Sequence, residues 1–181
     1  TILVTHDIEE ALTMGDVVQV LDNGRAISKG SPLDILGQPP QERVARLVGV
    51  ENIIEMQVYS LNTEDGVMVC QLSNNSDPEV DHLSIEVPLG QFGVGESLNI
   101  GIRASDIILS KARFYESSAR NQILGAVRGI EIRPPGYRIS LDCGGLLLHC
   151  QITGSSKDEM DIQIGQGLWA IFKASSCFVV S

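Results

Sequence analysis

The feature that most constrains this chain of 181 residues is a repeat within its last two thirds. NIIEMQV at residues 52–58 aligns with NQILGAV at 121–127, and LNIGIRASDIIL at 98–109 aligns with LWAIFKASSCFV at 168–179. The offsets are 69 and 70 residues, so the spacing is kept at both ends of the unit. Self-similarity at a fixed period is typical of a duplicated structural module. We therefore expect two modules of similar fold.

The repeated region has the pattern of a mainly β protein. From about residue 52, short alternating runs are separated by turns that contain glycine, which favours small β-barrels or sandwiches. Equivalent strands are expected near 54–59 and 123–132. The polar stretch SNNSDPEVD at 73–81 predicts a loop, and PPG at 134–136 predicts a turn.

Residues 1–50 have a mixed α and β pattern instead. Asp7 and Glu10 have the spacing of a capping box and predict the start of a short helix. Two β-branched runs flank Asn23-Gly24, the strongest short hairpin signal. PLDIL at 32–36 and QERVARLVG at 41–49 predict two further short helices. We divide the chain into residues 1–50, 51–113 and 114–181.

The charge distribution narrows the classes of partner. A net charge of -10 argues against nucleic acid, because binding phosphate backbones requires clustered Lys and Arg. Residues 1–50 carry seven acids and four bases, 51–113 carry ten and three, and 114–181 carry six and six. An anion is therefore most easily bound in the last third. No apolar run is long enough to span a membrane, so we expect a soluble protein.

Cysteine and histidine spacing gives no support for a metal site. The four cysteines, Cys70, Cys143, Cys150 and Cys177, form no C-x-x-C pair. We expect them to be buried thiols. His82 and His149 have no sequence partner for metal binding.

Three sets of motifs resemble known families. ILVTHDIEEAL, followed by GDVVQVLDNGRAISKGSP, resembles the end of the nucleotide-binding domain of ABC importers. GIRASDIILS resembles the GIRPEDI segment of the accessory TOBE domain that follows this ATPase, with Ala104-Ser105 in place of Pro-Glu. SSARNQILGAV, with LLLHCQITGSS and LWAIFKASS, resembles the molbindin-like module that binds molybdate and tungstate. The whole chain resembles the C-terminal half of a molybdate-type importer ATP-binding subunit.

This resemblance implies a fold and a cellular setting. The implied fold is mainly β, with tandem small OB-like β-barrel modules of the TOBE or molbindin type after a short α+β remnant of an ABC ATPase domain. The implied protein is a homodimer that is cytoplasmic, lies at the inner membrane and contacts the permease subunits of an importer. We expect it to sense the transported oxyanion and to regulate transport.

The resemblance gives His6 a role only within an intact parent protein. His6 falls at the switch histidine that contacts the γ-phosphate of ATP in ABC ATPases, where Mg also binds. The chain contains neither G-x-x-x-x-G-K-[ST] nor the LSGGQ signature, so its residues should not hydrolyse ATP by themselves. We expect the chain to begin inside a longer protein.

Molybdate and tungstate are tetrahedral dianions, so a selective site should offer hydrogen-bond donors. SSARN at 117–121 and FKASS at 172–176 supply them. We expect Ser118, Arg120, Lys173 and Ser175 to bind the oxyanion. The simpler interpretation is that both cations are solvated and paired with acids. A further alternative is a purely structural dimerisation domain of a sugar, polyamine, sulfate or iron importer ATPase, without a bound oxyanion.

The first repeat should not form a complete site. Glu51 stands where the second repeat has Arg120, and a carboxylate about 4 Å from an anion costs about 4 kcal/mol at an effective dielectric constant near 20. Arg103 and Ser105 remain possible contributors to a composite site.

The N-terminal residues are expected to leave apolar surface exposed. We expect five apolar side chains to pack on an ATPase core in the parent protein, namely Ile2, Leu3, Val4, Ile8 and Leu12. Because exposed apolar patches favour association, we expect contact with another copy of the chain across a twofold axis.

Overall fold

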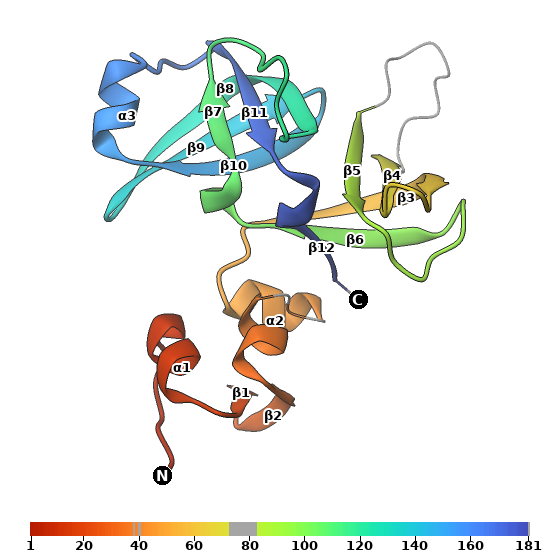
Figure 1. Cartoon of the computed structure of the whole chain (residues 1–181). Coiled ribbons are helices and arrows are strands. Elements are labelled where there is room, and N and C mark those ends of the chain that lie inside the picture. Colours follow the sequence, from red (N-terminus) through yellow and green to blue (C-terminus); the bar gives the residue numbers. More distant parts are fainter. Residues whose placement is uncertain (38, 40, 73–82, 181) are drawn as a thin grey trace.

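The computed structural model describes residues 1–37, 39, 41–72 and 83–180, apart from the side chains of residues 8, 9 and 12. Figure 1 shows two curled sheets and, below them, a smaller lobe formed by residues 1–50, which we call the N-terminal lobe. Residues 51–113 and 114–181 are called the first and second repeat. The predicted loop at 73–81 and His82 lie outside the described residues.

The N-terminal lobe has the predicted order of elements. These are α1 (Ile8–Met14), β1 (Val18–Asp22), β2 (Arg25–Gly30), the π-helical turn η1 (Leu33–Gly37) and α2 (Glu42–Leu47). The Asp7 Oδ1 accepts a hydrogen bond from the Glu10 N–H at 3.1 Å, as a capping residue does. Asn23 and Gly24 have φ of 48° and 76°, which gives the tight turn expected between β1 and β2.

Two five-stranded antiparallel sheets form the framework of the rest of the described chain. The first has the order β12-β6-β3-β4-β5 and the second has the order β10-β9-β8-β11-β7. The first repeat contributes β3 (Asn52–Asn62), β4 (Val67–Leu72), β5 (Ser84–Pro88), β6 (Ser97–Ile102), the 3-10 turn η2 (Ala104–Asp106) and β7 (Ile108–Ser110). The second contributes β8 (Asn121–Arg133), β9 (Gly136–Cys143), β10 (Leu146–Ile152), α3 (Gly154–Glu159), β11 (Gly167–Phe172), the 3-10 turn η3 (Ala174–Ser176) and β12 (Cys177–Val180).

The expectation of two similar modules is confirmed by strand order and register. Asn52 pairs with Ile102 as Asn121 pairs with Phe172. The register shifts after Val58 in β3 and after Val127 in β8, 69 residues later. The predicted strands near 54–59 and 123–132 are therefore equivalent, and the predicted turn at 134–136 connects β8 to β9.

The last strand of each repeat belongs to the sheet of the other repeat. β7, from the first repeat, pairs with β11, and β12, from the second repeat, pairs with β6. The buried side chains form one continuous core across both sheets, in which Ile54 and Met56 share a cluster with Leu141, Leu148 and Phe172. The division at residues 113 and 114 therefore follows the sequence repeat, while each sheet contains strands of both repeats.

Two buried asparagines join the repeats reciprocally. The Asn52 amide accepts from the His149 N–H at 2.7 Å and donates to the His149 C=O at 2.9 Å. The Asn121 amide makes the same pair of bonds to the Glu86 backbone, at 2.7 and 2.9 Å. Both asparagines are 3% exposed. Each amide therefore satisfies the backbone of a strand in the opposite sheet.

A second apolar cluster attaches the N-terminal lobe to the first sheet. Phe178 and Val180 of β12 pack with residues of η1 and α2, including Ile35, Val44 and Val48. Burial of this apolar surface holds the lobe against a strand that the second repeat supplies.

The predicted exposure at the start of the chain is confirmed where it is described. Ile2, Leu3 and Val4 are 92%, 53% and 87% exposed. The side chains of Ile8 and Leu12 lie outside the described part. The contact with a second copy remains a prediction.

Replacing Asn52 or Asn121 with alanine should destabilise both sheets together, because each change leaves a backbone N–H and C=O without a partner. We expect each variant to lose about 2–4 kcal/mol. Urea unfolding measures this loss as a lower midpoint at an unchanged slope. Asn62→Ala is the matched control, because Asn62 lies at the exposed end of β3 and its side chain bonds to Asp65 in the adjoining turn. Equal losses in all three variants would contradict a joining role.

Candidate functional site

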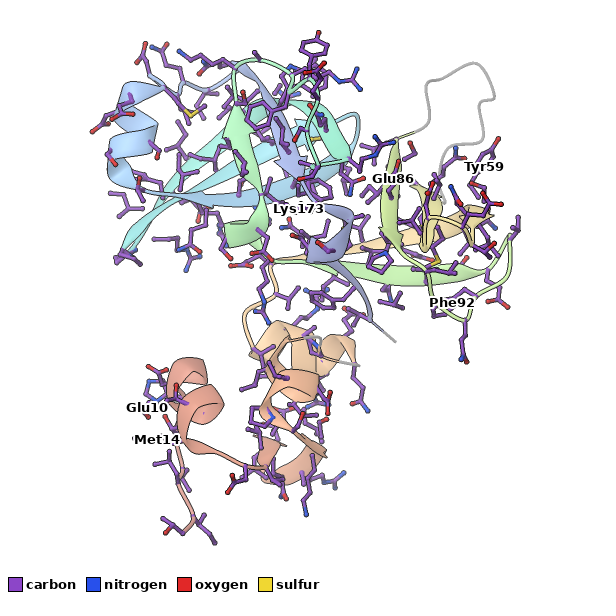
Figure 2. All side chains as sticks on the ribbon, viewed as in Figure 1. Glu10, Met14, Tyr59, Glu86, Phe92 and Lys173 are labelled. Atoms are coloured by element: carbon purple, nitrogen blue, oxygen red, sulfur yellow. The ribbon has the colours of Figure 1, made fainter. Side chains whose placement is uncertain are left out.

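A hollow of about 390 Å³ lies where the repeats meet, and we call it the junction hollow. Ser118, Lys173, Ala174 and Ser175 line it from the second repeat, and Gly66, Val67 and Pro88 line it from the first repeat. Figure 2 shows Lys173 and Glu86 in the region between the two sheets. Three of the four predicted oxyanion-binding residues are therefore brought together.

The two polar sides of the hollow are positioned by neighbouring elements. Lys173 follows β11, and Ala174 and Ser175 belong to η3, which packs against β5 of the first sheet. Ser118 lies in the segment that leads into β8. Ser118, Lys173 and Ser175 are all exposed, so a ligand can reach their donors.

Arg120, the fourth predicted residue, is not among the residues that line the hollow. Its Nε is 3.5 Å from the Glu86 Oε2. Glu86 is held in place because its backbone is bonded to the Asn121 amide. The guanidinium is thus directed to a carboxylate at the edge of the site, and sequence reasoning did not identify Glu86 as that partner.

The first repeat uses its equivalent residues differently. The Glu51 Oε2 accepts a hydrogen bond from the Ala104 N–H at 3.0 Å. Arg103 donates to the Val48 C=O at 3.3 Å and to the Leu36 C=O. Arg103 therefore anchors the N-terminal lobe, and neither Arg103 nor Ser105 is among the residues that line the junction hollow.

His149, whose backbone is bonded to the Asn52 amide, also makes a side-chain contact. Its Nδ1 is 3.0 Å from the Ser140 Oγ. Burial and, next, the positive charge of Arg138 lower the pKa of His149, while Glu131 and Glu51 act in the opposite direction. Burial thus favours the neutral imidazole at this contact with Ser140.

His6 lies in the N-terminal lobe, exposed and just before α1. Figure 1 shows this end of the chain far from the two sheets. His6 is therefore no part of the junction hollow.

The described residues show neither a metal centre nor a reactive thiol. No group of three or more His, Cys, Asp or Glu side chains among them is placed to hold a metal ion. All four cysteines are buried and free, as predicted. Burial raises the pKa of Cys70 to about 11 and those of Cys143 and Cys177 to about 12, so these thiols stay protonated. In the same part of the chain, no helix has the length and apolarity needed to cross a membrane.

Comparison with known proteins confirms the resemblance drawn from the motifs. Residues 117–179 match the TOBE domain model. The molybdate/tungstate import ATP-binding protein WtpC of Pyrococcus horikoshii is 36% identical over 176 residues, which are 97% of this chain and 46% of the relative. The match lies in the C-terminal part of such relatives. The chain thus spans about half the length of the curated relatives that it matches over nearly all its residues.

Two further similarities concern part of the chain. The spermidine/putrescine import ATP-binding protein PotA of Acetivibrio thermocellus is 37% identical over 108 residues, which are 60% of this chain and 27% of the relative. The solved structure of the cytoplasmic molybdate-binding protein ModG, with molybdate bound, superposes with a TM-score of 0.57. It is 21% identical and covers 73% of this chain and 97% of its own. At that identity it supports the fold, which is mainly β with OB-like modules.

The environment of His149 predicts a pH dependence of stability. Because its pKa is lower in the folded state than in the unfolded state, the unfolded state binds more protons, and stability falls as the pH drops below about 6.5. In His149→Gln the fall between pH 7 and pH 5 should be smaller, as measured by urea unfolding at each pH. His6→Gln changes an exposed histidine of the N-terminal lobe and serves as the control. Identical profiles for wild type and His149→Gln would contradict this assignment.

Proposed function

We propose that this chain is the oxyanion-sensing, regulatory part of an importer ATP-binding subunit and binds molybdate or tungstate in the junction hollow. The observation that carries the proposal is the convergence of Ser118, Lys173 and Ser175 on one hollow between the repeats. The sequence pattern predicts these residues as donors for a dianion, and Ser118 and Lys173 come from segments 55 residues apart.

The chemistry of the hollow suits a tetrahedral dianion. Lys173 supplies a positive charge, and Ser118 and Ser175 supply hydroxyl donors. Val67 and Pro88 form an apolar wall on the other side, which lowers the local dielectric constant and strengthens charge-assisted hydrogen bonds. Selection of molybdate or tungstate then depends on donor geometry and on the size of the hollow.

The relatives' names support this ligand class. WtpC is a molybdate/tungstate import protein, and ModG is a molybdate-binding protein with molybdate bound in its structure. In the same proposal, the longer protein binds ATP and Mg, uses His6 as its switch histidine, pairs as a homodimer and contacts membrane permease subunits at the inner membrane.

Regulation requires that the bound oxyanion favours one arrangement of the ATPase domains. A ligand shifts such an equilibrium only if it binds the two arrangements with different affinity. Ser175 lies two residues before β12, whose Phe178 packs in the cluster shared with the N-terminal lobe. Occupancy of the hollow can therefore act on the lobe through β12.

A second candidate is a structural dimerisation domain without a bound oxyanion. The similarity to PotA over 60% of the chain favours it, since that protein's name concerns polyamines. Equilibrium dialysis with molybdate, tungstate and sulfate separates the two candidates. Retention of molybdate or tungstate supports the sensor, whereas no retention of any of the three supports the structural domain.

Lys173→Ala should weaken tungstate binding about 5- to 150-fold, the range expected for a lost charge-assisted hydrogen bond. Isothermal titration calorimetry measures this change. Lys157→Ala is the control, because Lys157 lies in α3 of the same repeat and pairs with Asp158. Unchanged affinity in Lys173→Ala and in Arg120→Ala would place the site elsewhere.

Glu86→Gln should strengthen tungstate binding by a few-fold or more. The change removes a carboxylate from the edge of the hollow and releases Arg120 from its ion pair. The hydrogen bonds between the Glu86 backbone and Asn121 do not involve the Glu86 side chain, so the fold should be kept. Asp142→Asn is the matched control, since it releases Arg128 from an ion pair elsewhere in the second repeat. A weaker or unchanged affinity in Glu86→Gln would show that Glu86 does not compete with the oxyanion.

A further inference from the structure

In the first repeat, the Glu51 carboxylate occupies the position that corresponds to the open junction hollow beside η3 of the second repeat. The Glu51 Oε2 accepts a hydrogen bond from the N–H of Ala104, the first residue of η2. Ala174, the first residue of η3, lines the junction hollow. Among the described residues no carboxylate is bonded to the Ala174 N–H, because the residue equivalent to Glu51 is Arg120.

The equivalence of the two places follows from the pairing of the strands. Asn52 and Asn121, which follow Glu51 and Arg120, bind the backbones of His149 and Glu86. Two residues beyond Glu86 is Pro88, which pairs with Val67 in the wall of the junction hollow. Two residues beyond His149 is Gln151, which pairs with Arg138. Arg138 therefore corresponds to Val67: Val67 lines the junction hollow, and Arg138 lies at the equivalent position of the first-repeat place.

Arg138 brings a guanidinium to the first-repeat place and is paired there with Glu131. Its Nη2 bonds to Glu131 at 2.6 Å. Its Nε is buried and has no hydrogen-bond partner within the described part of the chain. The place thus combines the Ala104 N–H, the Arg138 guanidinium and two carboxylates, of which Glu131 pairs with Arg138 and Glu51 binds the N–H.

We propose that Glu51 is a built-in anion that fills the first-repeat counterpart of the oxyanion site, so that each chain holds one exchangeable tetrahedral dianion instead of two. This inference rests on the proposed function of the junction hollow. A tethered carboxylate competes effectively with a free ion because its binding costs no loss of translational freedom. The like charge of Glu51 also repels an incoming dianion.

The filled place gives the two repeats different roles. Glu51 holds η2 permanently, and the neighbouring Arg103 holds the Leu36 and Val48 carbonyls of the N-terminal lobe. In the junction hollow, Lys173 and Ser175 remain exposed to solvent. The first repeat is therefore a fixed attachment for the lobe, and the second repeat responds to the ligand.

The test compares tungstate binding and thermal unfolding in four proteins. These are the wild type, Lys173→Ala, Lys173→Ala with Glu51→Ala, and Lys173→Ala with Glu51→Gln. Equilibrium dialysis should give one tungstate per wild-type chain and strongly reduced binding in Lys173→Ala. The variant with Glu51→Ala should regain about one tungstate per chain and show a higher Tm when tungstate is added. The variant with Glu51→Gln should regain neither, because the glutamine oxygen can still accept the Ala104 N–H.

Each outcome decides between the two hypotheses. One tungstate per wild-type chain without recovery in the Glu51→Ala variant would overturn the inference and leave the proposed function intact. Recovery there, with no tungstate on the wild type, would support the inference and contradict the proposed site. Absence of binding in all four proteins would overturn both. If Glu51→Ala does not fold, Glu51→Ser replaces it, and two tungstates per wild-type chain would by themselves contradict a filled first site.

Discussion

Each sheet of this protein is completed by the last strand of the other repeat, and this exchange is the constraint on which the rest of the structure depends. β12 pairs with β6, and β7 pairs with β11. The amides of Asn52 and Asn121 connect the two sheets in the same reciprocal manner, because each amide bonds to the N–H and C=O of a strand in the opposite sheet. A shared core and shared edges join the two repeats into one structural unit. The junction hollow exists because elements of both repeats meet there.

The scaffold is symmetric while its charges are not. The register, the bulges and the asparagine bonds are the same in both repeats. At the residue before each asparagine, the first repeat has a carboxylate and the second has a guanidinium. The partners of these two residues also differ, because Arg120 pairs with the Glu86 carboxylate and Glu51 accepts a hydrogen bond from a backbone N–H. The equivalent places in the two repeats thus differ in one charged residue, since Glu51 makes a backbone contact in the first repeat and Arg120 pairs with Glu86 in the second.

Much of the candidate site could be proposed from sequence because its donors lie in or just before the repeated segments. Ser118, Lys173 and Ser175 stand in two short runs that are rich in donors, and both runs end at the same hollow. The sequence pattern also predicts Arg120 as a donor, but its ion pair with Glu86 depends on a β5 residue 34 positions earlier. Asn52 and Asn121 were visible as an identity at the start of both repeats, yet nothing local shows that an amide will bond to a distant strand.

The sequence by itself determined the elements and their repetition. Alternating apolar residues, the Asn23-Gly24 turn and the offset of 69 or 70 residues act through short-range sterics and side-chain periodicity, which a linear pattern records. Only the tertiary structure decided which sheet receives β7 and β12, that Arg103 holds the N-terminal lobe, and that Glu51 bonds to Ala104. These outcomes depend on contacts between residues about 50 or more positions apart, where burial and hydrogen-bond satisfaction select one partner among many that are locally equivalent.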